Sequence, residues 1–208
     1  MECDMITVMG LDLALGRTGV GIAQIRRGVI RYAWQVSCTS RVPNEPTIDR
    51  IVLARDRILR QVELERPILI VIEGYAFEAR DPGRVLGELG GLVKAGIRKI
   101  GIPYLVLGPT VIKAASGSGR ADKDAMVAAA RALTKNHITD HNAADAVMAS
   151  CVGAAWLTRS IPVQHAIGYE VQFDKPALRV ARRIRPDEYS TAQNPSAVMA
   201  PHMASAVA

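Results

Sequence analysis

The run Ile68-Leu69-Ile70-Val71-Ile72 limits what this chain can fold into more than any other stretch of the sequence. It is continuously aliphatic and mostly β-branched, and polar and apolar positions do not alternate along it. That pattern is typical of a strand covered on both faces, as in a parallel sheet between layers of helices. The run ends on Glu73, so the sequence predicts a carboxylate at the carboxyl end of a buried strand.

The segments on either side of this run predict an α/β domain. Three strands joined by two hairpins are expected ahead of it, at Met5–Leu13, Val20–Ile25 and Val29–Val36, with Gly16, Gly19 and Gly21 in the first turn. The rest of the pattern predicts a helix from Pro46-Thr47, one from about Gly83 to Lys99, a strand at Pro103–Leu107, and helices at Pro109–Ala115, Asp122–Leu133 and Asp140–Trp156. Without the short helix at Pro109–Ala115, the order βββαβαβαα favours a mixed sheet flanked by helices.

The bulk properties suit one folded domain with a basic surface. We expect that domain at residues 1–159, a weakly structured basic extension at 160–185 and a disordered tail at 186–208. A net charge of +6 favours a polyanionic partner. The three cysteines form no CxxC pair, no signal peptide is recognisable and no apolar window approaches about 18 residues. These features predict a cytoplasmic protein without a membrane span.

Acidic residues stand at three places where they could meet. Asp12 and Glu73 each end an expected strand, and ligands of α/β sheets gather beyond the carboxyl ends of parallel strands. Asp145 lies on the last helix. Clustered carboxylates are the hard oxygen ligands that two Mg²⁺ ions about 4 Å apart require for phosphodiester hydrolysis. The sequence therefore predicts a metal-dependent nuclease.

The residue that completes this cluster stays open between three neighbours of Asp145. On a helix, His141 and Asn142 share the face of Asp145, whereas Asp140 lies about 140° round and is expected to be the N-cap. Asp140 would turn inward only if the helix began later. The same seven residues, 140–146, also fit an ordinary capped helix that carries one surface acid.

Basic and aromatic residues near these acids are candidates for DNA contact. Lys113, Arg120 and Lys123 surround a Gly/Ser loop that is expected either to offer backbone N–H groups to a phosphate or to be merely solvated. Lys123 is predicted to stabilise charge on the scissile phosphate. Among the residues that follow the strand ending at Glu73, we expect base stacking from Tyr75 and Phe77 and phosphate contacts from Arg80 and Arg84. Aromatic residues after a strand are, however, more often core or lid residues.

Several motifs resemble one family. Gly10-Leu11-Asp12 with the glycines at 16–21, Val71-Ile72-Glu73 before an aromatic loop, the two lysines around a Gly/Ser turn, and Ala144-Asp145-Ala146 on the final helix are similar to RuvC-type Holliday-junction resolvases. The phrases Glu73-Gly74-Tyr75-Ala76-Phe77 and Leu86-Gly87-Glu88-Leu89-Gly90-Gly91 look most like phage and prophage members. The resemblance covers roughly residues 5–157.

The resemblance implies an RNase H-like fold and a homodimer that nicks four-way DNA junctions symmetrically in a bacterial or phage-infected cell, with two Mg²⁺ or Mn²⁺ ions in each active site. Asp12, Glu73 and Asp145 would be metal ligands, Lys123 the catalytic lysine and Lys113 a DNA contact. Two positions depart from the family. Asn142 stands where an acid or a histidine is usual, and Ala76 replaces the wedge aromatic, so Tyr75 or Phe77 would have to serve.

Three other functions compete with this interpretation. Asn142 makes a weakly catalytic or non-catalytic junction-binding protein conceivable. An RNase H-like RNA-processing nuclease fits the same fold. Actin-like ATPases and sugar kinases open with a similar Asp-Gly hairpin, but they need about twice this length. Whether a branch-migration or packaging partner is required does not follow from the sequence.

Overall fold

The computed structural model describes residues 5–26, 29–38, 46–74, 82–135 and 137–157. Its elements follow the predicted order, with the short helix included: β1 (Ile6–Asp12), β2 (Arg17–Arg26), β3 (Val29–Cys38), α1 (Thr47–Glu65), β4 (Leu69–Glu73), α2 (Pro82–Ile100), β5 (Tyr104–Leu107), α3 (Pro109–Ala114), α4 (Lys123–Thr134) and α5 (His141–Leu157). The predicted extension at 160–185 and tail at 186–208 lie outside the described residues.

The strands form one mixed five-stranded sheet in the order β3-β2-β1-β4-β5. β1, β2 and β3 are an antiparallel meander, and β4 and β5 run parallel to β1. This confirms the predicted fold class. The continuous apolar run at 68–72 is buried on both faces, as a parallel strand between two helical layers should be.

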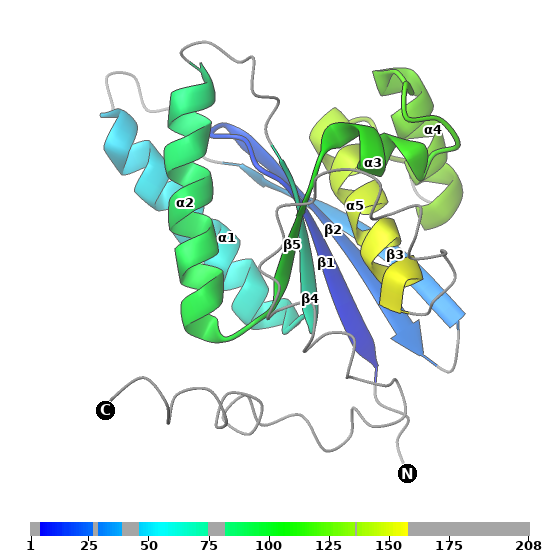
Figure 1. Cartoon of the computed structure of the whole chain (residues 1–208), viewed down its shortest axis with the longest axis horizontal. Coiled ribbons are helices and arrows are strands. Elements are labelled where there is room, and N and C mark those ends of the chain that lie inside the picture. The colour runs from blue at the N-terminus through cyan, green and yellow to red at the C-terminus, as the bar shows by residue number, and fades with distance from the viewer. Residues whose placement is uncertain (1–4, 27–28, 39–45, 75–81, 136, 158–208) are drawn as a thin grey trace.

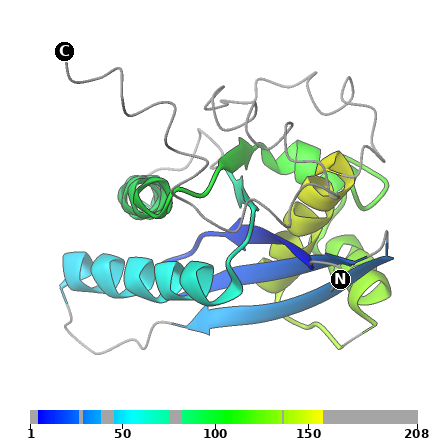
Figure 2. The same ribbon diagram turned by 90° about the horizontal axis from the view of Figure 1, so that it is seen from below.

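Two helical layers cover the sheet (Figures 1 and 2). The side chains of β1 and β4 alternate between them, as the two-residue period of a strand requires. One core lies between the sheet and α3, α4 and α5, and it takes Ile6 and Val8 from β1 and Leu69 and Val71 from β4. The other lies against α1 and α2, and it takes Met9, Leu11, Ile70 and Ile72. Within the described residues, no helix is long and apolar enough to span a membrane.

Helix α5 packs directly on the backbone of β1 and β2. A Cβ atom added to Gly10 or Gly21 would overlap the backbone oxygen of Ala146, and one added to Gly19 would overlap that of Asn142. The expectation that Gly19 and Gly21 belong to a turn is therefore wrong. Both lie inside β2, and the helix can approach only because they have no side chain.

Candidate active site

Asp12 and Glu73 end neighbouring parallel strands. The register of β1 and β4 ends with the pair Leu11 and Ile72, so the two acids follow directly at the same edge of the sheet. By strand alternation, both continue the set of side chains that faces α5 rather than α1 and α2. Two carboxylates are thereby directed toward the helix that carries the third.

Asp145 reaches this edge because of how α5 lies on the sheet. In the β1–β2 register, Asp12 is paired with Gly19, and the backbone of Asn142 sits directly on that glycine. The next turn of the helix, at Ala146, rests on Gly10 and Gly21. Asp145 lies between Asn142 and Ala146 on the helix, so the glycine contacts fix its position relative to the end of β1.

The three acids influence one another electrostatically. Burial, followed by the negative charges of Glu73, Asp145 and Asp140, raises the pKa of Asp12 from 3.8 to about 8. Burial and the charge of Asp145 raise the pKa of Glu73 from 4.5 to about 7. Burial also raises the pKa of Asp145. Without a counter-ion Asp12 and Glu73 therefore resist ionisation near neutral pH.

Lys113 is the lysine that is coupled to two of the acids. Its charge lowers the pKa of both Glu73 and Asp145, opposing the effect of burial. The backbone N–H of Gly74 donates to the oxygen of Leu107 at 2.7 Å, which joins the ends of β4 and β5, and α3 begins two residues after β5. That connection brings Lys113, in the last turn of α3, to the side of Glu73.

Lys123 and His141 are peripheral by comparison. Each lowers the pKa of Asp145, with His141 having the larger effect of the two, and both side chains are exposed. Lys123 is the first residue of α4, whose N-cap is Asp122, as predicted, with its Oδ1 accepting from the Ala125 N–H at 2.8 Å. The expected catalytic lysine thus acts on one acid only.

The Gly/Ser loop is not the open phosphate cradle that was one of the two expectations. The backbone N–H groups of Ser116, Gly117 and Ala121 donate to the oxygens of Lys113, Ala114 and Ser118. The N–H of Arg120 donates to the Ser118 hydroxyl at 3.2 Å. Most donors of the loop are therefore used inside it, whereas the Arg120 side chain is exposed.

The first turn of α5 is tied to β2 through Arg17, a residue that the sequence did not single out. Asp140 is the N-cap, as predicted, because its Oδ1 accepts from the Ala143 N–H at 3.0 Å. Its Oδ2 pairs with the Arg17 guanidinium at 2.6 Å. The Asn142 side-chain Nδ2 donates to the Arg17 backbone oxygen at 2.5 Å. Arg17 carries no local signal because its partners lie far away in the sequence.

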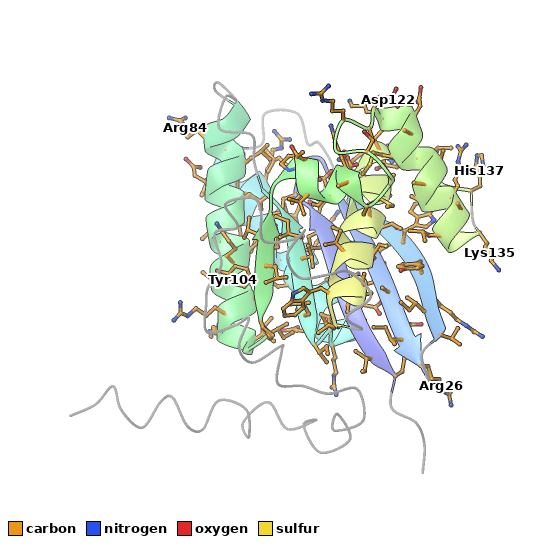
Figure 3. The ribbon with its side chains drawn as sticks, turned by 45° about the vertical axis from the view of Figure 1, so that its right-hand side comes forward. Arg26, Arg84, Tyr104, Asp122, Lys135 and His137 are labelled. Atoms are coloured by element: carbon orange, nitrogen blue, oxygen red, sulfur yellow. The ribbon has the colours of Figure 1, made fainter. Side chains whose placement is uncertain are left out.

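The remaining candidates are more distant or fall outside the description. Arg84 is exposed at the start of α2, with a 4.0 Å approach to Glu88, and Figure 3 shows it at the same end of the molecule as Asp122. Tyr75, Phe77 and Arg80 lie outside the described residues. In the described ranges, no three His, Cys, Asp or Glu side chains are already drawn together around a point that could hold a metal ion.

The chain is similar in sequence to several curated proteins that share one name, although it matches no family model. It is 30% identical over 146 residues to the crossover junction endodeoxyribonuclease RuvC of Mycobacterium avium, covering 67% of this chain and 77% of that protein. It is 27% identical over 124 residues to the RuvC of Pseudarthrobacter chlorophenolicus, covering 58% of this chain and 64% of that protein. The RuvC of Leifsonia xyli is 34% identical over 131 residues, which cover 59% of this chain and 62% of that protein. The chain thus spans less than two thirds of the length of these last two relatives.

Solved structures agree on the fold. The structure of Thermus thermophilus RuvC aligns with a TM-score of 0.63 at 23% identity, covering 74% of this chain and 97% of that chain. The same protein in complex with a Holliday junction substrate aligns with a TM-score of 0.65 at 22% identity, covering 74% of this chain and 96% of that one. The architecture is therefore RNase H-like, and the chain belongs to the family of the crossover junction endodeoxyribonuclease RuvC.

Proposed function

We propose that this protein is a divalent-metal-dependent endonuclease that resolves Holliday junctions and related branched DNA by paired symmetric nicks. The observation that carries the proposal is that Asp12, Glu73 and Asp145 lie at one edge of the sheet, close enough that the charges of Glu73 and Asp145 raise the pKa of Asp12. Membership of the RuvC family supports the substrate class, because the relatives bear the name crossover junction endodeoxyribonuclease.

The donor set fits a hard divalent cation. Asp12, Glu73 and Asp145 would hold Mg²⁺ or Mn²⁺, two ions in the full site, since carboxylate oxygens are the ligands that these metals prefer. Bound there, such ions would supply activation of a water molecule and neutralisation of charge on the scissile phosphate and the leaving oxygen. The raised pKa values of Asp12 and Glu73 are those expected of a metal-binding carboxylate cluster when no cation is bound.

Asn142 is the neighbour of Asp145 best suited to add a fourth oxygen. Both oxygens of Asp140 are occupied, one by the helix cap and one by Arg17. His141 is exposed and offers nitrogen, which Mg²⁺ accepts less readily than oxygen. The Asn142 amide spends its nitrogen on the Arg17 carbonyl, so its Oδ1 remains available.

The basic residues would act on the DNA backbone. Lys113 is the stronger candidate for stabilising charge at the scissile phosphate, because it is coupled to both Glu73 and Asp145. Lys123 and Arg120 would contact phosphates beside it. Tyr75, Phe77, Arg80 and Arg84 remain candidates for the DNA groove. A homodimer would supply the second nick, and an equilibrium mass of twice the 22.4 kDa of one chain at micromolar concentration is expected.

A junction-binding protein with little catalysis is the second candidate. It is favoured by Asn142, a neutral residue at a position where the family usually has an ionisable ligand. Three carboxylates would then have to balance the charge of two ions without help from a fourth. Such a protein would bind the same DNA but turn over slowly.

One experiment distinguishes these functions. The purified protein is incubated with a synthetic four-way junction, a linear duplex of the same sequence and an RNA hairpin, with and without Mg²⁺. Symmetric, metal-dependent nicks confined to the junction are expected. Tight junction binding without nicks would support the second candidate, and preferential cleavage of the hairpin would indicate an RNA-processing nuclease.

A further inference from the structure

Arg17 makes two independent contacts with the first turn of α5. Its guanidinium pairs with the Asp140 Oδ2 at 2.6 Å, and its backbone oxygen accepts from the Asn142 Nδ2 at 2.5 Å across 125 positions of sequence. The Asp140 side chain is only 15% exposed, whereas that of Arg17 is 61% exposed. The largely buried carboxylate of Asp140 is therefore paired with a guanidinium group at the protein surface.

The backbone of Arg17 is itself fixed by its neighbour Thr18. That side chain is 1% exposed. Its hydroxyl donates to the Ala14 oxygen at 2.8 Å and accepts from the Ala14 N–H at 3.2 Å. These two bonds close the loop that leaves Asp12, so the position of Arg17 is tied to the end of β1. A contact from Arg17 to α5 therefore links Asp12 to the helix that carries Asp145.

The contact between Arg17 and Asp140 should contribute little to the free energy of unfolding. Helix α5 is already docked by the glycine contacts along β1 and β2. An ion pair with one exposed partner contributes about 1 kcal/mol or less. Loss of the Arg17–Asp140 pair should therefore leave the fold intact. The loss should instead change the orientation of the Asp140 carboxylate, because only its bond to the Ala143 N–H would remain. The Asp140 charge acts on Asp12, so a change at Asp140 is felt at the first of the three acids.

We propose that Arg17 is a positioning residue. It clasps the first turn of α5 through Asp140 and Asn142, and so sets the distance between Asp12 and the metal-binding face of that helix. The proposal rests on the function given above, because it presumes that these acids bind a divalent cation. It assigns Arg17 no contact with the reacting atoms.

The test measures Mn²⁺ binding to the DNA-free protein by electron paramagnetic resonance, together with kcat and KM on a four-way junction. Arg17→Gln should weaken Mn²⁺ binding by about 10-fold, the low end for residues that orient metal ligands. It should lower kcat to a similar degree while KM stays within about twofold. Arg17→Lys should recover most of the Mn²⁺ affinity, because an ammonium group can still pair with Asp140.

Three further variants test the interpretation. Asp140→Asn retains a good N-cap residue but loses the ion pair, and should match Arg17→Gln. The double variant Arg17→Gln/Asp140→Asn should be no worse than either single variant if the pair acts as a unit. Arg55→Gln is the matched control, because Arg55 forms an ion pair of the same 2.6 Å length with Asp56 on the exposed side of α1. It should change nothing.

The outcomes are separable. If wild-type protein binds no Mn²⁺, the proposed metal site fails. If it binds Mn²⁺ and Arg17→Gln binds equally well with unchanged kcat, the positioning role alone is overturned. A drop in melting temperature for Arg17→Gln well beyond that of Arg55→Gln, with no recovery by Arg17→Lys, would also overturn it, because the contact would then be merely structural.

Discussion

The backbone oxygen of Asn142 lies directly over the Cα of Gly19, with no room for a Cβ between them. Gly19 is the cross-strand partner of Asp12. The point of closest approach between helix and sheet is therefore also the point at which the first carboxylate meets the first turn of α5.

Gly19→Ala should destabilise the protein by about 3 kcal/mol, the upper end for overpacking, because the methyl group meets rigid backbone. A fall in melting temperature of about 10 °C is expected by calorimetry or circular dichroism. Gly87→Ala is the matched control, since Gly87 is an exposed helical residue with nothing within 4 Å of its added Cβ. That variant should be as stable as wild type or slightly more so. Equal melting temperatures for the two variants would contradict the packing described for α5.

Asp145→Asn should abolish junction cleavage, with a loss greater than about 100-fold, because losing a metal ligand costs more than losing a residue that orients one. Junction binding should be unchanged, since the substitution removes negative charge rather than a DNA contact. Gel-shift and nicking assays on the same four-way junction measure both. Asp124→Asn, an exposed acid in the first turn of α4, is the control and should cut normally. Full activity of Asp145→Asn would refute the proposed ligand set.

The metal-free protein should become less stable as the pH rises. The folded-state pKa of Asp12, about 8, exceeds its ordinary value of 3.8, so folding favours the protonated carboxyl group. Stability from this group is fully present below about pH 4 and is lost as the pH rises through about 8. Glu73 acts in the same direction, with a folded-state pKa of about 7. Melting in EDTA between pH 5 and 9 measures the slope.

The Asp12→Asn variant provides the control for that slope. It should melt at a higher temperature than wild type at pH 8 in EDTA and show a flatter pH dependence, because the buried charge is gone. Mg²⁺ should stabilise the wild type but not this variant, and the stabilisation of the wild type should be largest near pH 8. A wild-type protein that gains stability between pH 5 and 8 without metal would argue against the electrostatics of the site.

Lys113 and Lys123 should have separable effects on the pH dependence of cleavage. Lys113 lowers the pKa of Glu73 and Asp145, so Lys113→Gln should move the acid limb of the kcat/KM profile to higher pH, because metal binding needs deprotonated carboxylates. Lys123→Gln should move it less, because it is coupled to Asp145 alone. A larger shift for Lys123→Gln would reverse the assignment of the two lysines.

Asn142→Asp should increase Mn²⁺ affinity if the Asn142 oxygen faces the ions, because a carboxylate binds a divalent cation more strongly than an amide. The gain measured by calorimetry is expected despite the loss of the Arg17 hydrogen bond. His141→Ala is the comparison and should leave affinity within about twofold. Weaker Mn²⁺ binding by His141→Ala than by Asn142→Ala would identify the histidine as the fourth ligand.

The sheet was predictable because its signals are local. The apolar run at 68–72 predicted β4 without reference to any other residue. Asp122 and Asp140 predicted the starts of α4 and α5, because aspartate is a common N-cap residue. The turn predicted at Gly19 and Gly21 is wrong for the opposite reason. A glycine that makes a turn and a glycine that admits a helix look alike in sequence, and here the helix lies more than one hundred positions away.

The site was predictable to the extent that strand ends dictate it. Asp12 and Glu73 followed from the positions at which their strands stop, and the helix phase related Asn142 and His141 to Asp145. Arg17 could not be found in that way, because an arginine that follows a glycine turn is typical of a solvent-exposed strand end. The weight of Lys113 relative to Lys123 also depended on a fact beyond sequence, namely that β5 ends beside β4.

The late place of α5 in the chain has a consequence during synthesis. Residues 12 and 73 emerge from the ribosome well before residue 145, and the docking surface for the helix is bare backbone at Gly10, Gly19 and Gly21. A nascent chain can therefore pair its strands early but cannot assemble its three acids. The proposed metal site would therefore be complete only after α5 has been synthesised and has docked on these glycines.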